Sequence, residues 1–324
     1  MSIEPDHRKF LITSHSIDGT FESCPRRFEF RHLYQQYPLL ETSGLAADVG
    51  TALHEAAQEW TRSYSIEKAE WTLLKWWPWE LEDMRKQAGM KPDYARTLGN
   101  ALNLLNAFVR HKFWDDWEVA RLPDGSPAIE LPWRINHTSL GSFTNPIDGS
   151  ETFLATQGKI DWILQHRKIP NLFRVTDMKT TILDEPLQNA NFRFSGQAGQ
   201  YGLVLAQALG LDWQREGLDV CYFIAEFGEF GFPVTNPMEH HLEPMEIYEA
   251  IEAKNERLRR MISMGRQAFW PRRSHGCVFY QKPCGFLDVC HRREPEFLTQ
   301  WFEDDRDRFR KENRIYEPFW IVEA

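Results

Sequence analysis

The chain has 324 residues, with 47 acidic and 38 basic side chains and a formal net charge of −9. This acidic balance argues against a surface that coats polyanions broadly, but it allows a local basic groove. Hydrophobic residues make up 42% of the chain and aromatic residues 14%, which is enough for a full core. No stretch approaches the roughly 20 apolar residues that span a bilayer, and the polar start MSIEPDHRKF is unlike a signal peptide. We therefore expect a cytoplasmic protein that does not bind membranes.

The first third of the chain has a helical pattern. Two short helices are predicted within residues 14–34, where Ser16 is the expected N-cap of the first and Pro25 falls in the first turn of the second. A longer helix is predicted over residues 46–62. Residues 60–118 continue the helical pattern and are rich in Trp, Leu and Lys, so we interpret them as a helical insertion.

The pattern changes at the turn-forming sequence LPDGSP, after which strands predominate. Three strands are predicted, with the sequences AIELPWRI, ETFLATQGKIDWILQ and LFRVTDMKTTIL. A helix over residues 196–209, capped by Gly210, leads to the strand LDVCYFIAEF, and a long helix is predicted over residues 243–269. Three strands, a helix and a strand, with helices on both sides, indicate an α/β fold. Because there is no internal repeat and no clear linker, we expect residues 1–324 to form one domain.

Two aspartates and a lysine lie on consecutive predicted strands. Asp161 lies in the apolar strand GKIDWIL, and Asp177 and Lys179 occupy alternate positions of the next strand, which puts them on one face. If the strands pair, Asp161 approaches Asp177, and two such carboxylates repel unless a cation or a proton lies between them. Oxygen ligands suit Mg²⁺ or Mn²⁺, and a lysine beside the ion could orient water or stabilise charge on a phosphoryl oxygen. A D-x-K tripeptide by itself also fits solvated charges at the end of a strand.

Four further polar residues accompany these strands in the sequence. His54 lies on the helix after Gly50, and Glu130 opens the β region in an otherwise apolar context. Gln197 and Tyr201 are four residues apart on the helix after the D-x-K strand, so they share one face of that helix. Each residue taken alone also fits an ordinary structural or surface position.

The chain has five cysteines, and this odd number without an export signal argues against a disulfide framework. Cys221 lies in an apolar predicted strand, where a cysteine acts as a small buried hydrophobic residue. Cys277, Cys284 and Cys290 lie within fourteen residues near the C-terminus, and Cys24 is the remaining one. Four sulfurs are the usual complement of a metal site.

Together these motifs resemble those of the PD-(D/E)XK nuclease superfamily, in particular its RecB-like and Cas4-like nucleases. The family has a helical His, a G-x-x-D strand, a D/E-x-K strand and a Q-x-x-x-Y helix. The matching residues here are His54, Gly158–Asp161, Asp177–Lys179 and Gln197–Tyr201. The resemblance covers roughly residues 14–290. It implies a restriction-endonuclease-like core, with a mixed central sheet flanked by helices, and a prokaryotic or viral source.

The resemblance also implies a catalytic site for Mg²⁺ or Mn²⁺. The expected ligands of the ion are His54, Asp161, Asp177 and, through its backbone carbonyl, Met178. Lys179 would position the water nucleophile, and Gln197 and Tyr201 would orient Lys179 or the substrate backbone. Glu130 is a weaker candidate for the ligand shell.

Iron–sulfur members of the family carry one cysteine in an N-terminal S-x-S…C-P-x-x-F segment and three near the C-terminus. The sequence SHSIDGTFESCPRRFEF is similar to that segment, so the resemblance implies a structural [4Fe–4S] cluster held by residues 14–34 and 270–292. Its ligands would be Cys24, Cys277, Cys284 and Cys290. The spacing C-x₆-C-x₅-C departs from the family's usual C-x-x-C pair, and a Zn²⁺ ion or unconnected thiols are the alternatives. By analogy with a disulfide, the cluster would stabilise the fold by roughly 5 kcal/mol.

The implied function is a Mg²⁺- or Mn²⁺-dependent deoxyribonuclease that acts as an exonuclease on DNA ends or single strands. One alternative is a non-catalytic DNA-binding or assembly subunit, with a partner protein from recombination, repair or CRISPR spacer acquisition. Another is a redox iron–sulfur protein. Basic residues follow Cys24 and lead into Cys277. They could form a positive rim for phosphates, or a solvated helix face balanced by glutamates.

Overall fold

The computed structural model describes residues 8–35, 37–38, 45–80, 83, 95–181, 196–227, 234–273, 277–279, 282–287, 290, 302–303 and 320–323. Two segments expected from the sequence lie partly outside these ranges. They are the helical insertion, at residues 81–82 and 84–94, and the C-terminal cysteine segment, at residues 274–276, 280–281, 288–289 and 291–292. None of the helices in the described ranges is long and apolar enough to cross a membrane.

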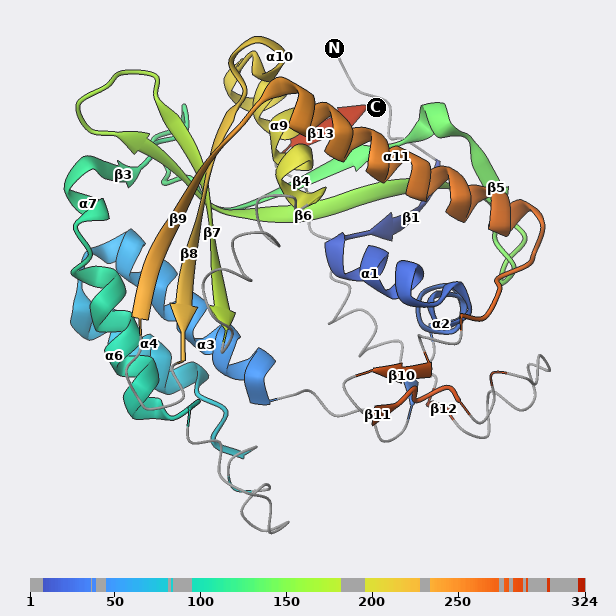
Figure 1. Cartoon of the computed structure of the whole chain (residues 1–324), viewed down its shortest axis with the longest axis horizontal. Coiled ribbons are helices and arrows are strands. Elements are labelled where there is room, and N and C mark those ends of the chain that lie inside the picture. The colour runs from blue at the N-terminus through green and yellow to red at the C-terminus, as the bar shows by residue number, and fades with distance from the viewer. Residues whose placement is uncertain are drawn as a thin grey trace.

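A mixed sheet of nine described strands forms the centre of the fold (Figure 1). The strands are β1 (Lys9–Thr13), β3 (Trp117–Val119), β4 (Ile129–Asn136), β5 (Ser142–Thr144), β6 (Glu151–His166), β7 (Phe173–Thr181), β8 (Leu218–Glu226), β9 (Val234–Leu242) and β13 (Trp320–Glu323). Six of them follow the order β13-β4-β6-β7-β8-β9, and β1, β3 and β5 also pair with β6. β6 can serve several neighbours because its 16 residues extend over roughly 50 Å.

Helices cover both faces of this sheet. One layer contains α3 (Leu45–Ser63), α4 (Ile66–Trp76), α6 (Leu98–Val109) and α7 (Phe113–Asp116), and the other contains α9 (Gly196–Leu209), α10 (Trp213–Glu216) and α11 (Pro244–Arg266). The apolar run of β8 serves both layers, because alternate side chains of a strand point to opposite faces. Cys221 and Phe223 belong to the core under the first layer, and Val220 and Tyr222 to the core under the second. The predicted α/β fold, a mixed central sheet flanked by helices, is confirmed.

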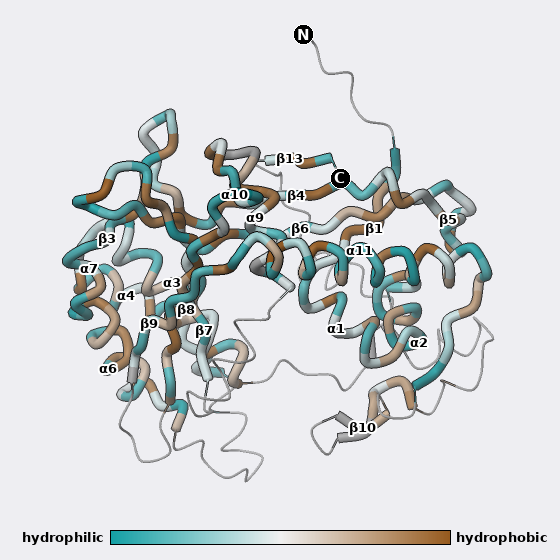
Figure 2. The backbone as a smooth tube through the Cα atoms, turned by 45° about the horizontal axis from the view of Figure 1, so that its top comes forward, coloured by the Kyte–Doolittle hydropathy of each residue, from teal (hydrophilic) through white to brown (hydrophobic). Residues whose placement is uncertain are grey.

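A third group of helices packs at one end of the sheet. It consists of α1 (His15–Ser23), α2 (Pro25–Phe28) and the π-helix Glu29–Leu33. Figure 2 shows α11 alternating between hydrophilic and hydrophobic residues along its length, as expected of a helix with one buried side. In its last turns Leu258, Met261 and Ile262 pack against Phe21 and Phe28 of the N-terminal helices. An apolar core therefore joins the N-terminal helices, which flank Cys24, to the end of α11, which precedes the C-terminal cysteines.

Several predicted boundaries differ from the structure. The N-cap of α1 is Ser14, whose hydroxyl accepts from the Ile17 N–H, and Ser16 lies inside the helix. The predicted helical insertion over 60–118 extends too far, because Trp117 already begins β3. The sequence did not predict the strand β9, because VTNPMEHHL contains a proline and three charged or titratable side chains. β9 lies at the edge of the sheet, where a strand tolerates such residues.

A buried polar chain connects α11 to the sheet. The Lys254 ammonium donates to the Thr13 hydroxyl at 3.2 Å, Thr13 and Thr156 share a hydrogen bond of 3.1 Å, and the Thr156 hydroxyl lies 3.0 Å from the His137 Nε2. His137 is 3% exposed, and burial lowers its pKa from 6.5 to about 3, with the Lys254 charge adding to the effect. His137 is thus neutral in the folded protein at neutral pH.

We expect His137 to make the fold acid-sensitive. Between pH 6.5 and about 3 the unfolded chain protonates this histidine and the folded chain does not, so stability falls as pH decreases through that window. The loss is at most about 1.4 kcal/mol per pH unit. Urea unfolding at several pH values should therefore show a shallower acid limb for His137→Asn than for the wild type. Equal slopes in the two proteins would contradict the assignment.

Candidate metal centre and cysteine pocket

The two aspartates of the candidate centre lie where β6 and β7 part. These strands pair from Gln165 and Phe173 up to Trp162 and Thr176. Asp161 and Asp177 are next in register, beyond the last pair. There a side chain replaces the backbone ladder, because the Met178 N–H donates to the Asp161 carboxylate at 2.9 Å. Both aspartates are buried, with exposed fractions of 8% and 3%.

Helix α3 places His54 beside this opening. At Gly50 a Cβ atom would lie 2.7 Å from the Thr180 hydroxyl of β7, so glycine permits the close approach of helix and strand. One turn further along the helix, the His54 Nε2 lies 2.9 Å from the Asp161 carboxylate. The Trp162 indole N–H donates to the Thr61 hydroxyl at 2.9 Å and fixes the other end of α3 against β6.

Glu130 enters the centre from β4. Its carboxylate accepts from the Gln58 amide at 2.5 Å and from the Lys159 ammonium at 2.6 Å, and it lies 3.9 Å from the His54 Nε2. The backbone of Glu130 has a φ of 54°, in the left-handed region that non-glycine residues adopt at a cost of order 1 kcal/mol. Such strain is concentrated at functional sites.

The second carboxylate, Asp177, connects Lys179 with helix α9. The Lys179 ammonium lies 2.5 Å from one Asp177 oxygen. The Tyr201 hydroxyl donates to the other oxygen at 3.4 Å and accepts from the Gln197 amide at 2.5 Å. Gln197 and Tyr201 therefore face the centre, as their spacing predicted. They reach it through Asp177, however, whereas the sequence interpretation had them orient Lys179 or the substrate.

The pKa values of the two aspartates are shifted in opposite directions. Burial, together with the neighbouring Asp161 carboxylate, raises the pKa of Asp177 to about 6. Burial acts in the same direction on Asp161, but the charges of His54 and Lys179 outweigh it and hold the pKa of Asp161 below its usual value. The two carboxylates of the pair therefore differ strongly in how readily they ionise.

The two basic groups respond to these carboxylates. Burial opposes the protonated form of His54, yet Asp161, Glu130 and Asp177 raise its pKa to about 9. Burial likewise opposes the charged form of Lys179, and the two aspartates raise its pKa above the ordinary lysine value. The protonated His54 and Lys179 side chains thus compensate the buried negative charge of the carboxylates.

The donor set fits a divalent cation with oxygen and nitrogen ligands. One ligand atom each from His54, Glu130 and Asp161 lie within 4.8 Å of one another. An octahedral shell with bonds of about 2.1 Å separates neighbouring ligands by roughly 3 Å and opposite ligands by roughly 4 Å. Asp177 supplies a further carboxylate beside this group. A cation here would replace the proton on His54, because metal ligands must be deprotonated.

Sequence reasoning missed two residues of this centre. Gln58 donates to Glu130 and lies 3.0 Å from the His54 Nδ1, and Lys159 is the ion-pair partner of Glu130. Gln58 lies one helical turn after His54, and Lys159 is two positions before Asp161 on the same strand. Both spacings place the residue on the same face as a motif residue, so periodicity could have found them.

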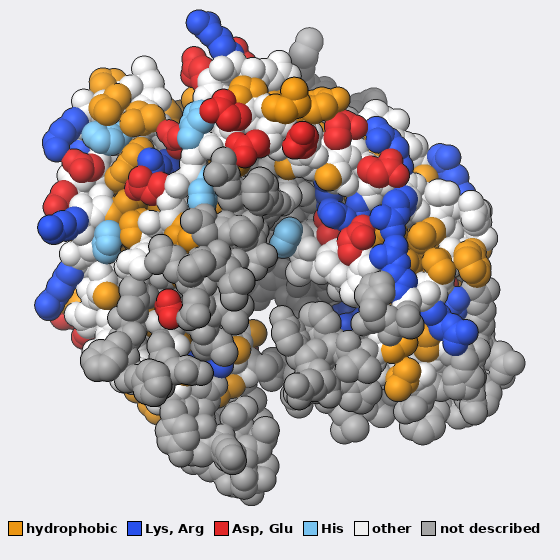
Figure 3. All heavy atoms as spheres, in the orientation of Figure 1, with side chains coloured by type: hydrophobic (Ala, Val, Ile, Leu, Met, Phe, Trp, Pro, Cys, Tyr) orange, Lys and Arg blue, Asp and Glu red, His pale blue; other side chains and the backbone are white. Residues whose placement is uncertain are grey.

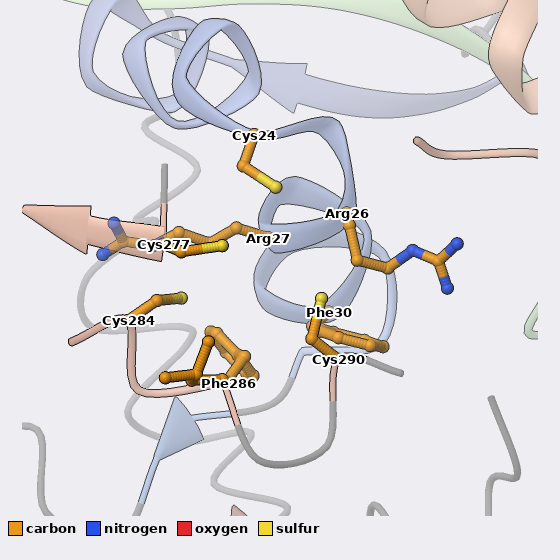
Figure 4. A pocket seen from close by; sticks show the side chains of 9 residues that line it. Cys24, Arg26, Arg27, Phe30, Cys277, Cys284, Phe286 and Cys290 are labelled. Atoms are coloured by element: carbon orange, nitrogen blue, oxygen red, sulfur yellow. The ribbon is translucent and has the colours of Figure 1, made fainter. Parts of the chain in front are cut away.

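The four cysteines of the predicted cluster line one pocket. Cys24, at the junction of α1 and α2, faces Cys277, Cys284 and Cys290, and the four sulfurs point into a common space (Figure 4). The Phe30 and Phe286 rings pack against each other along the pocket wall, with 5.3 Å between the ring centroids. Cysteines separated by more than two hundred residues therefore line the same pocket.

The sulfurs in this pocket are widely spaced. No three cysteine sulfurs of the described residues lie within 4.8 Å of one another. Four thiolates around a Zn²⁺ ion with bonds of about 2.3 Å would be only about 3.8 Å apart. Burial raises the pKa of Cys284 and Cys290, so a bound cation is needed to hold them as thiolates.

Several basic residues of the segments next to the cysteines form ion pairs. Lys254 pairs with the buried Asp18 at 2.5 Å. Glu22 of α1 accepts ion pairs from three arginines, Arg257 at 3.0 Å, Arg260 at 3.4 Å and Arg273 at 3.7 Å. Figure 3 shows acidic and basic side chains side by side over α1 and α11. This arrangement fits a balanced face better than a positive rim for phosphates.

Comparison with known proteins places the chain in a family. Residues 13–291 match the PD-(D/E)XK nuclease superfamily. The chain belongs to this superfamily. The family resemblance seen in the sequence motifs is thereby confirmed, and the helix, strand and D-x-K elements described above lie within the matched region.

Searches of individual proteins give weaker similarities. No curated protein matches the chain. Among similar solved structures, a protein from Eubacterium rectale that is proposed to be an exonuclease is 13% identical, with a TM-score of 0.47, and the match covers 89% of this chain and 98% of that one. SSO0001 is 12% identical with a TM-score of 0.24, over 72% of this chain and 83% of that one. Identities and scores this low carry no argument about substrate.

As a member of the PD-(D/E)XK superfamily with converging carboxylates, the protein should be stabilised by a divalent cation. Mn²⁺ at about 100 times its dissociation constant should add about 2.7 kcal/mol and raise the melting temperature by roughly 5 °C. Thermal unfolding with and without Mn²⁺ measures this. Asp161→Asn should abolish the rise, whereas Asp115→Asn, an exposed carboxylate on α7, should keep it. A full rise in Asp161→Asn would place the ion elsewhere.

Proposed function

We propose that the protein is a Mg²⁺- or Mn²⁺-dependent deoxyribonuclease that acts as an exonuclease on DNA ends or single strands. The observation that carries the proposal is the convergence of Asp161, Asp177 and Lys179 at the parting of β6 and β7. A buried pair of carboxylates beside a charged amine is costly to the fold. Because the chain belongs to a nuclease superfamily, we interpret these buried charges as groups that serve phosphodiester cleavage.

The acidic side chains and His54 would hold the cation. Its expected protein ligands are His54, Glu130, Asp161, Asp177 and the Met178 carbonyl. A bound Mg²⁺ or Mn²⁺ would offset the negative charge at the scissile phosphate and make a water easier to deprotonate. Gln58 would keep the His54 ring and the Glu130 carboxylate in place, since its amide contacts both.

Lys179 would act on the phosphate and the attacking water. Its raised pKa keeps the side chain charged at neutral pH, and its ammonium group sits against Asp177 at the opening of the centre. A fixed positive charge in this position stabilises negative charge that develops on a phosphoryl oxygen. Tyr201 and Gln197 would hold Asp177, and through it Lys179, in a constant orientation.

The four cysteines would bind a structural [4Fe–4S] cluster. Convergence of Cys24 with the three C-terminal cysteines supports this, as does a sulfur spacing wider than Zn²⁺ requires. The aromatic wall formed by Phe30 and Phe286 would exclude water from the cluster. A second redox centre has no support in the described residues, so the role assigned to the cluster is structural.

Replacement of Lys179 should abolish cleavage without loss of folding. With Mn²⁺ and DNA labelled at the 5′ or the 3′ end, Lys179→Ala should reduce the rate at least about 100-fold, because a positive charge at the phosphate is removed. Lys168→Ala, an exposed lysine paired with Asp116, is the matched control and should cut normally. The labelled ends also report polarity and the preference for single or double strands.

Two results of this experiment would reject the nuclease proposal. Cleavage that survives in Lys179→Ala would show that the activity comes from another site or a contaminant. DNA binding without any cleavage by the wild type, under all divalent conditions, would support the non-catalytic DNA-binding subunit instead.

The cluster proposal predicts a colour that depends on all four cysteines. Protein purified without oxygen should be brown and contain about four iron and four sulfide per chain. Cys290→Ala should lose the colour, whereas Cys221→Ala, a buried cysteine outside the pocket, should retain it. Colourless wild-type protein with stoichiometric zinc would establish the alternative ion.

A further inference from the structure

Helix α4 and the turn after it carry a group of exposed aromatic side chains. Trp71 is 73% exposed, and Trp76 and Trp79 are each 48% exposed. The chain has thirteen tryptophans, and among those in the described ranges these three alone are classed as exposed. Their concentration in nine residues is unexpected, since a tryptophan gains most from burial.

The inner face of the same helix is fully packed. Ala69 and Leu73 are buried in the core that α4 shares with α3 and α6, and Trp77 is 3% exposed beside them. The exposed tryptophans therefore do not result from a helix that is poorly docked on the fold. They form an outer surface of the helical layer, which covers the face of the sheet that carries Met178 (Figure 1).

Two lysines accompany the exposed tryptophans on α4. Lys68 and Lys75 are exposed, and spacings of three and four residues place them next to Trp71 on one face of α4. Neither lysine forms an ion pair with any residue in the described part of the chain. Glu67 lies one turn before Trp71 on the same side of α4, and its carboxylate accepts a hydrogen bond from the Ser65 hydroxyl at 2.7 Å.

We propose that the surface formed by Lys68, Trp71, Lys75, Trp76 and Trp79, the α4 surface, binds single-stranded DNA. Unpaired bases would stack on the indole rings, and the lysines would contact the phosphates between them. Every base has a π-face, so aromatic rings interleaved with positive charges hold single strands with little sequence preference. The inference rests on the proposed nuclease function for the choice of DNA over RNA.

The aromatic composition with interleaved lysines favours a nucleic acid over a protein at the α4 surface. The exposed large hydrophobic residues between 64 and 79 are all aromatic, with Tyr64 added to the three tryptophans. A protein-binding surface also uses tryptophan, but it usually depletes lysine. On α11, by contrast, Lys254, Arg257 and Arg260 are already paired with Asp18 and Glu22.

Binding can be measured separately from cleavage. The host protein is Lys179→Ala without added divalent cation, and the probe is a fluorescein-labelled oligothymidylate of about 25 nucleotides followed by anisotropy. Trp71→Ala in this host should weaken binding at least about fivefold, because stacking of one base is lost. Trp71→Tyr should restore most of the affinity, and Trp71→Leu, which remains apolar but cannot stack, should not.

The contribution of the two lysines can be recognised from the salt dependence of binding. Replacing Lys68 and Lys75 together by Ala should reduce the slope of log Kd against log salt by about 1.4, since each phosphate contact on a single strand contributes about 0.7. Trp71→Ala should lower affinity and leave that slope unchanged. Tyr248→Ala is the matched control, because Tyr248 is a 54% exposed aromatic residue on α11, and it should change neither quantity.

The outcomes distinguish this inference from the nuclease proposal. If Trp71→Ala and Trp71→Leu both bind the oligonucleotide as tightly as the host, the α4 surface does not bind DNA, whether or not the wild type cuts. Trp71-dependent binding in a protein whose wild type never cuts would uphold the α4 surface and overturn the nuclease. An unchanged melting temperature in each variant excludes misfolding as the cause.

Discussion

The parting of β6 from β7 is the constraint on which the candidate centre depends. A sheet continues as long as backbone groups can satisfy each other, and here the Met178 N–H is satisfied by the Asp161 side chain. Because the ladder ends, the Asp161 carboxylate can contact the Met178 N–H and His54, while the Asp177 carboxylate contacts Lys179 and Tyr201. A normal pairing at this point would have put two like charges in direct cross-strand contact, which is unfavourable.

The surrounding elements compensate the charge that this opening gathers. α3 brings His54, β4 brings Glu130 with its partner Lys159, and α9 brings Tyr201. Each of these contacts supports another, so removal of one partner leaves a buried group uncompensated, which costs more than the lost contact itself. A cation that replaces the proton on His54 therefore need not rebuild these contacts.

The sequence predicted the long helices and four of the nine described strands of the sheet, β4, β6, β7 and β8, because apolar periodicity is a local signal. The G-x-x-D, D-x-K and Q-x-x-x-Y spacings are local signals too, and they indicated the motif residues. It did not predict the left-handed backbone of Glu130 or the path from Tyr201 through Asp177 to Lys179. Those features arise from where a helix meets a strand distant in sequence. The ion pairs of Glu22 with arginines of the far end of the chain were hidden for the same reason.

The cysteine pocket does not stabilise the fold as a disulfide would. A disulfide restricts the unfolded chain, but an unfolded chain would release a bound cluster, so the proposed cluster would contribute through binding to the folded state alone. The two cysteine-bearing segments are held together without it, by the Arg26 guanidinium on the Trp270 carbonyl at 2.8 Å and by the packing of Phe28 on Trp270. The four thiols are therefore already brought together by protein contacts, and a cluster that binds them pays little ordering entropy in doing so.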